Sequence, residues 1–417
     1  MRAFFQIMKV ELLGALRSKV IFFYALFSAA WIVFGPDVLK YDGSQDGAFL
    51  LSVRYLLGLV FGVSIVFFGA LAVGSVSSDR AACRLQLALI KPVRHSIIAL
   101  ARIAAIVAVG SAVLALASLL VYLSIGRGRV CDHVYSPLME DPKIGARRIF
   151  DDCMEKDRNF KERVAEIGSR EVMKYLESYV LDTYETIDSG KSASWIFPDV
   201  ENTGGALAVR IKLNDMFGRT DAVIGSFSFG GFSGPLENIN KTLVRVPLVK
   251  TGAGEPSALI FENKSKNSVS LQPRRDLHIL VEADGFGWNI FRAWLMMTSI
   301  LAIVVASGVF LGSALSRGVA VFALMALLFA MVISPATMED YPDPIESNAI
   351  DRFGLMMTEF CADLTFSLTK HNPISQLESS ECVEWRDVFS ASLSALIHSA
   401  AFSAIAGLAM LRKSDRA

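Results

Sequence analysis

The sequence predicts an α-helical polytopic membrane protein with six transmembrane helices and an inserted extracytoplasmic α+β domain, in which a helical start precedes a small β-sandwich. The 417 residues are 53% hydrophobic, which exceeds the share in an ordinary soluble protein. Six apolar runs approach or exceed the roughly 20 residues that a span needs. The segments between them alternate between basic and acidic, although the formal net charge is zero. The runs occupy 20–35, 55–76, 98–125, 289–313, 318–334 and 388–411.

The alternation of charge predicts how the chain is oriented. Acidic residues concentrate in 335–387, whereas Lys and Arg concentrate in the short segments on the other side of the runs. Because Lys and Arg in short loops favour the cytoplasmic side, we expect both termini to be cytoplasmic and the protein to lie in a bacterial cytoplasmic (inner) membrane. The basic set is Arg2, Lys9, Arg17, Lys19, Arg80, Arg84, Lys91, Arg94, Arg317, Arg412, Lys413 and Arg416.

Residues 1–125 are predicted to hold a cytoplasmic interfacial helix and the first three spans. Within 3–16, four apolar residues share one helical face, which suits a helix lying in the interface. A simple extension of the first span is equally compatible with the sequence. The long basic segment that precedes the run 20–35 carries Glu11 and argues against a cleaved secretory signal. The four apolar residues are Phe4, Ile7, Met8 and Leu12.

Residues 126–288 are long enough to form a domain with its own core. The part 143–187 is charged and has a helical pattern of apolar residues. The rest is β-branched and is punctuated by Gly, Pro, Asn and Asp, which is typical of short antiparallel strands in a small sandwich. The expected strands are 206–213, 222–229, 241–249, 257–263 and 276–283.

Residues 289–417 are predicted to hold spans four to six. A tight turn around Ser316 separates the fourth run from the fifth. The segment 335–387 is amphipathic and acidic, so we expect an extracytoplasmic helical segment that lies at the membrane surface and does not cross it.

The loop 77–96 is predicted to contain a short helix between a good N-cap residue, Asp79, and a helix breaker, Pro92. The helix presents basic and leucine-rich surfaces. Such a helix can dock in a groove on a soluble cytoplasmic partner. A solvated turn that rests on lipid headgroups explains the loop equally well.

These residues resemble the permeases of type-2 ABC transporters. That family carries an acidic residue and Arg after the second span, then a leucine-rich helix and a Pro-containing basic stretch before the third. The six spans, the N-terminal amphipathic helix and the short basic tail are also similar, whereas the insertion 126–288 departs from the family's compact form. The matching positions are Asp79, Arg80, Leu87, Leu89, Pro92, Val93 and Arg94.

The resemblance implies a permease subunit that moves or extracts a substrate with ATP hydrolysed by a separate subunit. Its partners would be two cytoplasmic ABC ATPase subunits, which bind ATP and Mg, and a second permease chain in a homo- or heterodimer. No cofactor is expected in this chain, which would be no enzyme, and no nucleic acid is expected among its partners. Coupling to the ATPase would involve Asp79, Arg80, Arg84, Leu87, Ile90, Pro92 and Arg94.

Other chemical motifs are weak. The closest approach to a phosphate-binding loop is 185–192, but Glu185 stands where that loop needs Gly. Cys131 and His133 are possible metal ligands to which Cys153 could add a third, but a tetrahedral site needs three or four placed ligands. We therefore predict no metal site.

The cysteines and one histidine are further candidates. The two outer segments hold an even number of cysteines, which suits disulfides in an oxidising compartment, with free thiols as the alternative. The expected pairs are Cys131 with Cys153 and Cys361 with Cys382. His398 lies inside a span, where an ionisable group is a functional candidate. A neutral imidazole bonded to a neighbouring helix is the plainer interpretation.

Three other classes of function compete with the permease. A non-transporting signalling or scaffold protein would use its outer domain to bind a partner, and nothing in the sequence excludes it. A proton-coupled carrier would need carboxylates inside the membrane, but the six runs lack interior Asp and Glu. A membrane enzyme would need a catalytic constellation, and none is visible. The substrate cannot be inferred from these residues.

Overall fold

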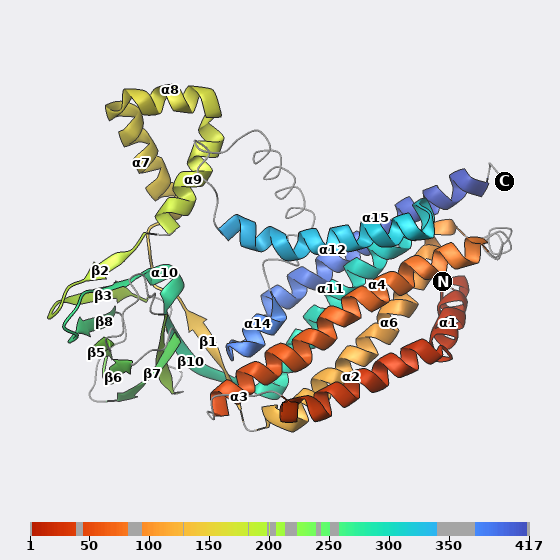
Figure 1. The fold of residues 1–417 in the computed structure, drawn as a ribbon, viewed down its shortest axis with the longest axis horizontal. Coiled ribbons are helices and arrows are strands. Elements are labelled where there is room, and N and C mark those ends of the chain that lie inside the picture. The colour runs from red at the N-terminus through yellow and green to blue at the C-terminus, as the bar shows by residue number, and fades with distance from the viewer. Residues whose placement is uncertain are drawn as a thin grey trace. The chain divides into compact units, whose positions relative to one another are not determined.

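The computed structural model describes residues 2–38, 45–81, 94–127, 129–181, 183–197, 200, 206–212, 223–238, 243–250, 258–339 and 372–414. The chain divides into two compact units (Figure 1). The first, called the helical unit, comprises 1–130, 284–335 and 358–417. The second, called the sheet unit, comprises 131–283 and 336–357.

The helical unit contains four helices that are long and apolar enough to cross a membrane, counted over the described residues. They run over Phe49–Ser78, His95–Gly126, Phe286–Ala314 and Trp385–Leu411, which correspond to the predicted second, third, fourth and sixth spans. The elements are α1 Arg2–Leu16, α2 Lys19–Val38, α3 Gln45–Ser52, the π-helix η1 Val53–Leu57, α4 Gly58–Ala81, α6 His95–Val121, the π-helix η2 Tyr122–Gly126, α11 Phe286–Ala314, α12 Arg317–Glu339, α14 Pro373–Glu378 and α15 Trp385–Ser414.

The predicted first and fifth spans are less clear. Helices α1 and α2 are bent by 64° at Arg17 and Ser18, so the N-terminal helix is not a straight extension of the first run. The pair counts as a fifth span only if both helices together form one broken span. Helix α12 is apolar over Arg317–Phe329, which is shorter than a span. Six spans therefore stay a prediction.

Helix α11 is the centre of the helical unit. In its most apolar window 72% of the residues are buried, against 33% to 50% in the other three long helices. Two glycines bring it close to α4: a Cβ atom added to Gly308 would lie 2.8 Å from the carbonyl oxygen of Gly69, and one on Gly312 would lie 2.7 Å from that of Val73. Small residues four positions apart allow such close approach between helices in membranes.

Three helices follow strand β1 Val130–Tyr135 and form most of the predicted helical part 143–187, whose last residues form strand β2 Glu185–Ile187 instead. They are α7 Pro142–Lys156, α8 Arg158–Ile167 and α9 Ser169–Leu181. Asp141 caps α7 by accepting a hydrogen bond from the amide of Lys143, and Asp157 caps α8 in the same way from Asn159. The three helices enclose their own small apolar core, which includes Ala146, Val164, Val172 and Leu176.

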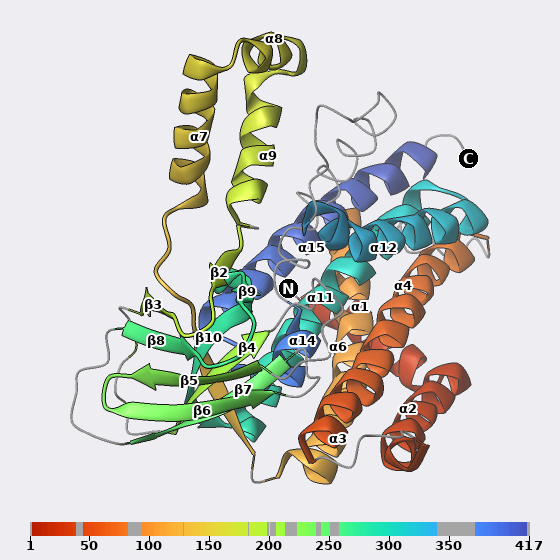
Figure 2. The ribbon, with the colours of Figure 1, turned by 60° about the vertical axis from the view of Figure 1, so that its left-hand side comes forward.

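Strand β1 and seven of the strands after the helices form one eight-stranded sheet and not the predicted sandwich (Figure 2). Its order is β1-β10-β4-β7-β6-β5-β8-β3, and β2 pairs separately with β9. The expected strands correspond to β4, β5, β7, β8 and β10. The strands are β1 Val130–Tyr135, β2 Glu185–Ile187, β3 Ser192–Ile196, β4 Leu207–Lys212, β5 Val223–Phe229, β6 Phe232–Asn238, β7 Leu243–Lys250, β8 Ala258–Asn263, β9 Val269–Leu271 and β10 Leu277–Gly285, with the short helix α10 Pro273–Asp276 before the last.

A single sheet suffices because it curls around its own apolar face. Alternate residues of β5 and β8 point into the core, where Phe227, Phe229 and Phe261 are fully buried. The twist inherent in β-strands accumulates across a wide sheet and lets one layer enclose such a core. Strands β5 and β6 are joined by a two-residue loop whose first residue, Gly230, has φ of +57°, as tight hairpins require.

Candidate functional site

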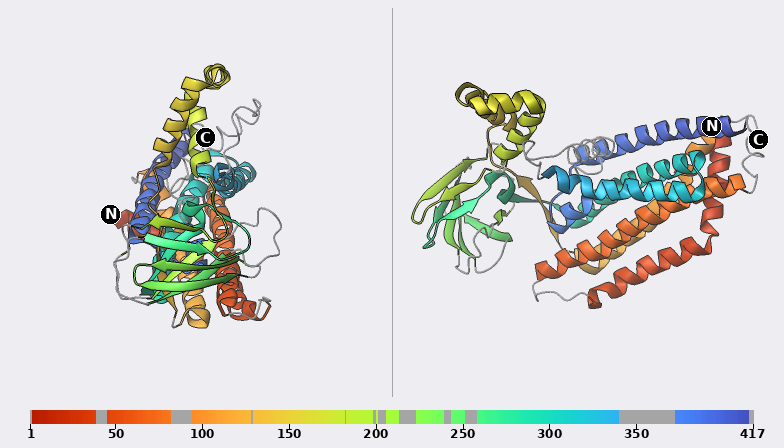
Figure 3. Two further views of the ribbon diagram at one scale, coloured as in Figure 1. Left: turned by 90° about the vertical axis from the view of Figure 1, so that its left-hand side faces the viewer. Right: turned by 45° about the horizontal axis from the view of Figure 1, so that its top comes forward.

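One end of the helical unit, called the basic end, gathers the segments that the sequence links to function. Helix α4 ends there at Ala81, α6 begins at His95, and a Cβ atom on Gly407 of α15 would lie 2.8 Å from the amide of Ser96. The N-terminal end of α1 and the C-terminal end of α15 lie at this same end (Figure 3, right). The described basic residues of these segments include Lys9, Arg17, Lys19, Arg80, Arg94 and Arg317.

Arg102 of α6 ties three helices together at the basic end. Its side chain is 5% exposed, and its Nε atom lies 2.9 Å from Oε1 of Glu11 on α1. Its Nη1 atom donates to the backbone carbonyl oxygen of Ser75 on α4 at 3.4 Å. Removing one partner of a buried ion pair is strongly destabilising because the other charge is left uncompensated. The Arg102 link therefore holds α1, α4 and α6 in a fixed arrangement.

The link lies close to the residues that the resemblance assigns to coupling. Asp79 and Arg80 belong to the last turn of α4, so Asp79 continues that helix and is not the N-cap of a new one. Arg94 is exposed and occupies the N-cap position of α6. The rest of the docking segment, which holds Arg84, Leu87, Ile90 and Pro92, lies outside the described residues, so the docking helix stays a prediction.

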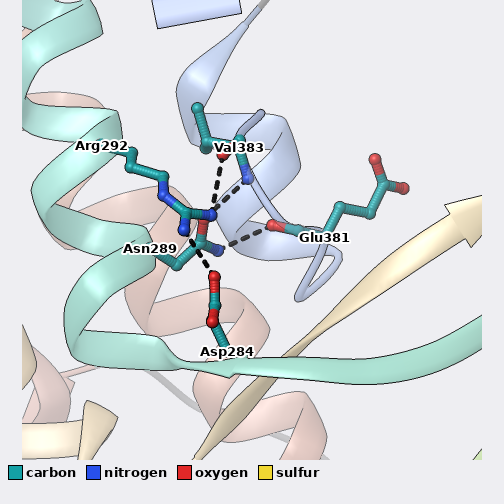
Figure 4. A network of polar contacts seen from close by, with 5 residues as sticks. All are labelled: Asp284, Asn289, Arg292, Glu381 and Val383. Atoms are coloured by element: carbon teal, nitrogen blue, oxygen red, sulfur yellow. Dashed lines mark hydrogen bonds and ion pairs between the residues drawn. The ribbon is translucent and has the colours of Figure 1, made fainter. Parts of the chain in front are cut away.

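A polar clasp holds the opposite end of α11 (Figure 4). Asn289 is fully buried, donates through Nδ2 to the carbonyl oxygen of Glu381 at 2.7 Å, and accepts from the amide of Val383 at 2.7 Å. Arg292 donates to the carbonyl oxygen of Val383 at 3.3 Å, and its Nη2 atom lies 2.5 Å from Oδ2 of Asp284. The clasp fixes the chain that leads into α15. An Asn and an Arg inside the run 289–313 were the sequence signal for it.

The disulfide prediction is partly wrong. Cys153 is a free, half-buried thiol, whereas Cys131 and Cys382 are disulfide-bonded. The predicted pair of Cys131 with Cys153 therefore does not form. Cys361 lies outside the described residues, so its pairing with Cys382 stays a prediction. The even number of cysteines in the outer segments could not show which thiols the fold brings together.

His398 forms its hydrogen bonds within its own helix. Its Nδ1 atom lies 2.8 Å from the carbonyl oxygen of Ser394, one turn earlier in α15, and 3.2 Å from the hydroxyl of the same residue. The imidazole also lies beside the ring of Phe402. The expected bond to a neighbouring helix is thus replaced by one inside α15, which satisfies one ring nitrogen.

The segment 131–133, which holds two of the possible metal ligands, forms an ion pair through Asp132. Asp132 of β1 is 1% exposed, and its two carboxylate oxygens lie 3.0 Å and 3.2 Å from the two terminal nitrogens of Arg245 on β7. Burial raises the pKa of Asp132, and the guanidinium of Arg245 partly offsets that rise. Among the described residues, no three His, Cys, Asp or Glu side chains gather as metal ligands would.

The segment whose sequence is partly similar to a phosphate-binding loop does not have the structure of such a loop. Residues 185–192 form strand β2, a turn at Gly190 and the start of β3, so no helix follows the turn. Glu185 accepts a hydrogen bond from the indole of Trp195 at 2.8 Å. This segment joins two strands.

Comparisons of the chain with protein-family models, with curated proteins and with solved structures found no match.

Proposed function

We propose that this chain is the permease subunit of an ABC transporter, lies in a bacterial cytoplasmic membrane with both termini in the cytoplasm, and uses ATP hydrolysed by a separate subunit. The observation that carries the proposal is the Arg102 link. It joins α1, α4 and α6 at the basic end, where α4 leads into the basic, leucine-rich segment that resembles a docking helix. A partner that moves this segment would move three helices together.

The packing suggests how such a movement would travel. Helix α4 touches α11 through Gly308 and Gly312, where backbone meets backbone without intervening side chains. Close-packed contacts of this kind transmit displacement because they cannot be compressed. At the other end of α11, the clasp joins the helix to the start of α15. A push on α4 would thus reach α11 and α15.

The partners follow from the same proposal. Two cytoplasmic ATPase subunits would bind ATP and Mg and dock at the segment after α4, and a second permease chain would complete the transport path. The coupling residues would be Asp79, Arg80, Arg84, Leu87, Ile90, Pro92 and Arg94.

Charge reversal in the docking segment tests the proposal. The double variant Arg80→Glu and Arg84→Glu should insert at normal levels, because the proposed docking surface would face water, where charge changes normally shift stability by only about 0.5 kcal/mol. It should lose co-purification with its ATPase, because like charges facing one another across an interface cost several kcal/mol. The amount of inserted permease chain and the amount of ATPase bound to it are both measured after affinity purification from the native membrane.

A matched control separates docking from a general effect of charge. Arg17→Glu with Lys19→Glu reverses two exposed charges at the same basic end, outside the docking segment. This variant should keep the ATPase at the wild-type ratio. Loss in both variants, or in neither, would contradict the docking assignment. If the unmodified chain never co-purifies with an ATPase, the permease proposal fails and the signalling or scaffold function takes its place.

A further inference from the structure

An apolar groove of about 660 Å³ runs along one side of α4. Its lining extends from Val63 to Ser78, a stretch of helix of about 22 Å at 1.5 Å per residue. One leaflet of a bilayer has a hydrocarbon depth of about 15 Å, so the groove is long enough for a lipid acyl chain. The lining residues are Val63, Val66, Phe67, Ala70, Leu71, Gly74, Ser75, Ser78 and Arg317.

The polar residues of the groove lie together at the basic end. Ser75 and Ser78 donate their hydroxyl hydrogens to carbonyl oxygens of their own helix. Arg317 supplies the positive charge. It is exposed, and among the residues that the structure describes it forms no ion pair. Arg317 is also the first residue of α12, where the free amides of a helix N-terminus add positive potential.

The position of Arg317 places this charge at the level of lipid headgroups. It follows directly on α11, which is long and apolar enough to cross a membrane. A turn at the end of such a helix lies at a membrane surface, whichever side that surface faces. An anionic headgroup at this level would meet the guanidinium while its acyl chain lies on apolar side chains.

We propose that this groove binds an anionic phospholipid, with one acyl chain along α4 and the phosphate at Arg317. The proposal goes beyond the transport function and does not depend on it. A phosphate suits a guanidinium because the planar fork of donors matches its oxygens.

Charge favours a lipid over a second copy of this chain as the occupant. At the basic end the described residues include Lys9, Arg17, Lys19 and Arg94, so a second copy would bring like charges toward Arg317. The carboxylate of Glu11 is already paired with Arg102. An anionic headgroup brings the opposite charge without these conflicts.

Fluorescence quenching tests the proposal with the full chain in vesicles. Val66 is 41% exposed in the groove, so Val66→Trp places a reporter there with little repacking. Phosphatidylglycerol and phosphatidylcholine, each with brominated acyl chains, are compared as quenchers, and the signal of the chain without this tryptophan is subtracted. We expect phosphatidylglycerol to bind about fivefold more strongly, the factor that roughly 1 kcal/mol per cation near a membrane implies.

In the variant Arg317→Gln, phosphatidylglycerol and phosphatidylcholine should bind equally well. The control Arg94→Gln removes an exposed charge outside the groove and should keep the preference for phosphatidylglycerol. Equal quenching by both lipids in the parent would mean ordinary lipid contact and would overturn the proposal. No quenching by either lipid would mean that protein covers the groove, as a second copy would, and would also overturn it. Neither result bears on ATPase docking.

Discussion

Three arginines beside the apolar helices differ in what their charges meet. Arg102 and Arg292 are 5% and 6% exposed, and each lies against a carboxylate, Glu11 and Asp284 respectively. Arg317 is exposed and has no such partner among the described residues. A charge held in an apolar environment persists only when it is paired, so the first two are structural links. The third is left available to a ligand.

The ion pair between Asp132 and Arg245 predicts a pH-dependent effect of one substitution. Burial raises the folded-state pKa of Asp132, so the folded protein binds this proton more tightly than the unfolded chain, and the contribution of Asp132 to stability falls as pH rises through that pKa. Arg245→Gln removes the cation that limits the rise in the pKa of Asp132. The variant should therefore match the wild type at low pH, where Asp132 is neutral, and lose stability as pH increases.

The loss should reach about 1–2 kcal/mol near neutral pH, less than for a fully buried pair, because the Arg245 side chain is 48% exposed. The apparent Tm of both proteins in detergent, measured from pH 4 to pH 8, checks this. In an Asp132→Asn background the effect of Arg245→Gln should not change with pH. A difference in Tm that is constant across the range would contradict the prediction.

At the scale of elements, local patterns predicted what local chemistry decides. The four longest helices were predicted from apolar runs, and β4, β5, β7, β8 and β10 from short β-branched stretches between Gly, Pro, Asn and Asp. Strand β6 was missed because Gly234 and Pro235 interrupt it. The close approach of β6 to β7 requires glycine at position 234, because a Cβ atom on Gly234 would lie 2.3 Å from the carbonyl oxygen of Pro247.

The candidate site was only partly predictable for a related reason. The docking segment could be named from its order along the chain. The pairing of Arg102 with Glu11 joins residues far apart in sequence, and only the packing of α1 against α6 brings them together. The same holds for the disulfides and for the clasp at Asn289. Patterns along a chain show which residues are unusual, but partners are chosen by tertiary structure.

The crossing of α4 and α11 predicts a strong difference between two glycines. Gly312→Ala would place a methyl group 2.7 Å from the backbone oxygen of Val73, which no side-chain movement can relieve. We expect a loss of about 1–3 kcal/mol, the usual cost of overpacking, seen as a lower apparent Tm in detergent. Gly62→Ala on α4 meets no atom within 4 Å, and it should be neutral or slightly stabilising because Ala favours helix. Equal effects of the two substitutions would contradict this packing.

At the scale of the whole molecule, the helical unit is polarised along its helices. Its basic end carries the exposed Lys9, Arg17, Lys19, Arg94 and Arg317. Its opposite end carries an aromatic cluster where α11 and α15 begin, together with the exposed Arg54, which pairs with Glu378, and the exposed Arg386. Aromatic rings of this kind mark the level of a membrane interface. Helix α11 has 29 residues, about 44 Å, so it exceeds the roughly 30 Å hydrocarbon core and leaves its first turns to the interface. The cluster is Trp288, Phe291, Trp294, Trp385 and Phe389.

This polarity predicts which parts of the chain are reachable from outside the cell. Because the basic end should face the cytoplasm, a cysteine at Ser316→Cys, in the turn between α11 and α12, should resist a membrane-impermeant maleimide in intact cells. A cysteine at Ser169→Cys, on the exposed start of α9 in the sheet unit, should react at once. Both are placed in a Cys153→Ser chain, since Cys153 is a free thiol, and labelling is measured relative to that chain. Permeabilising the membrane should expose position 316. Labelling at 316 but not at 169 in intact cells would reverse the orientation and, with it, the side on which any ATPase could dock.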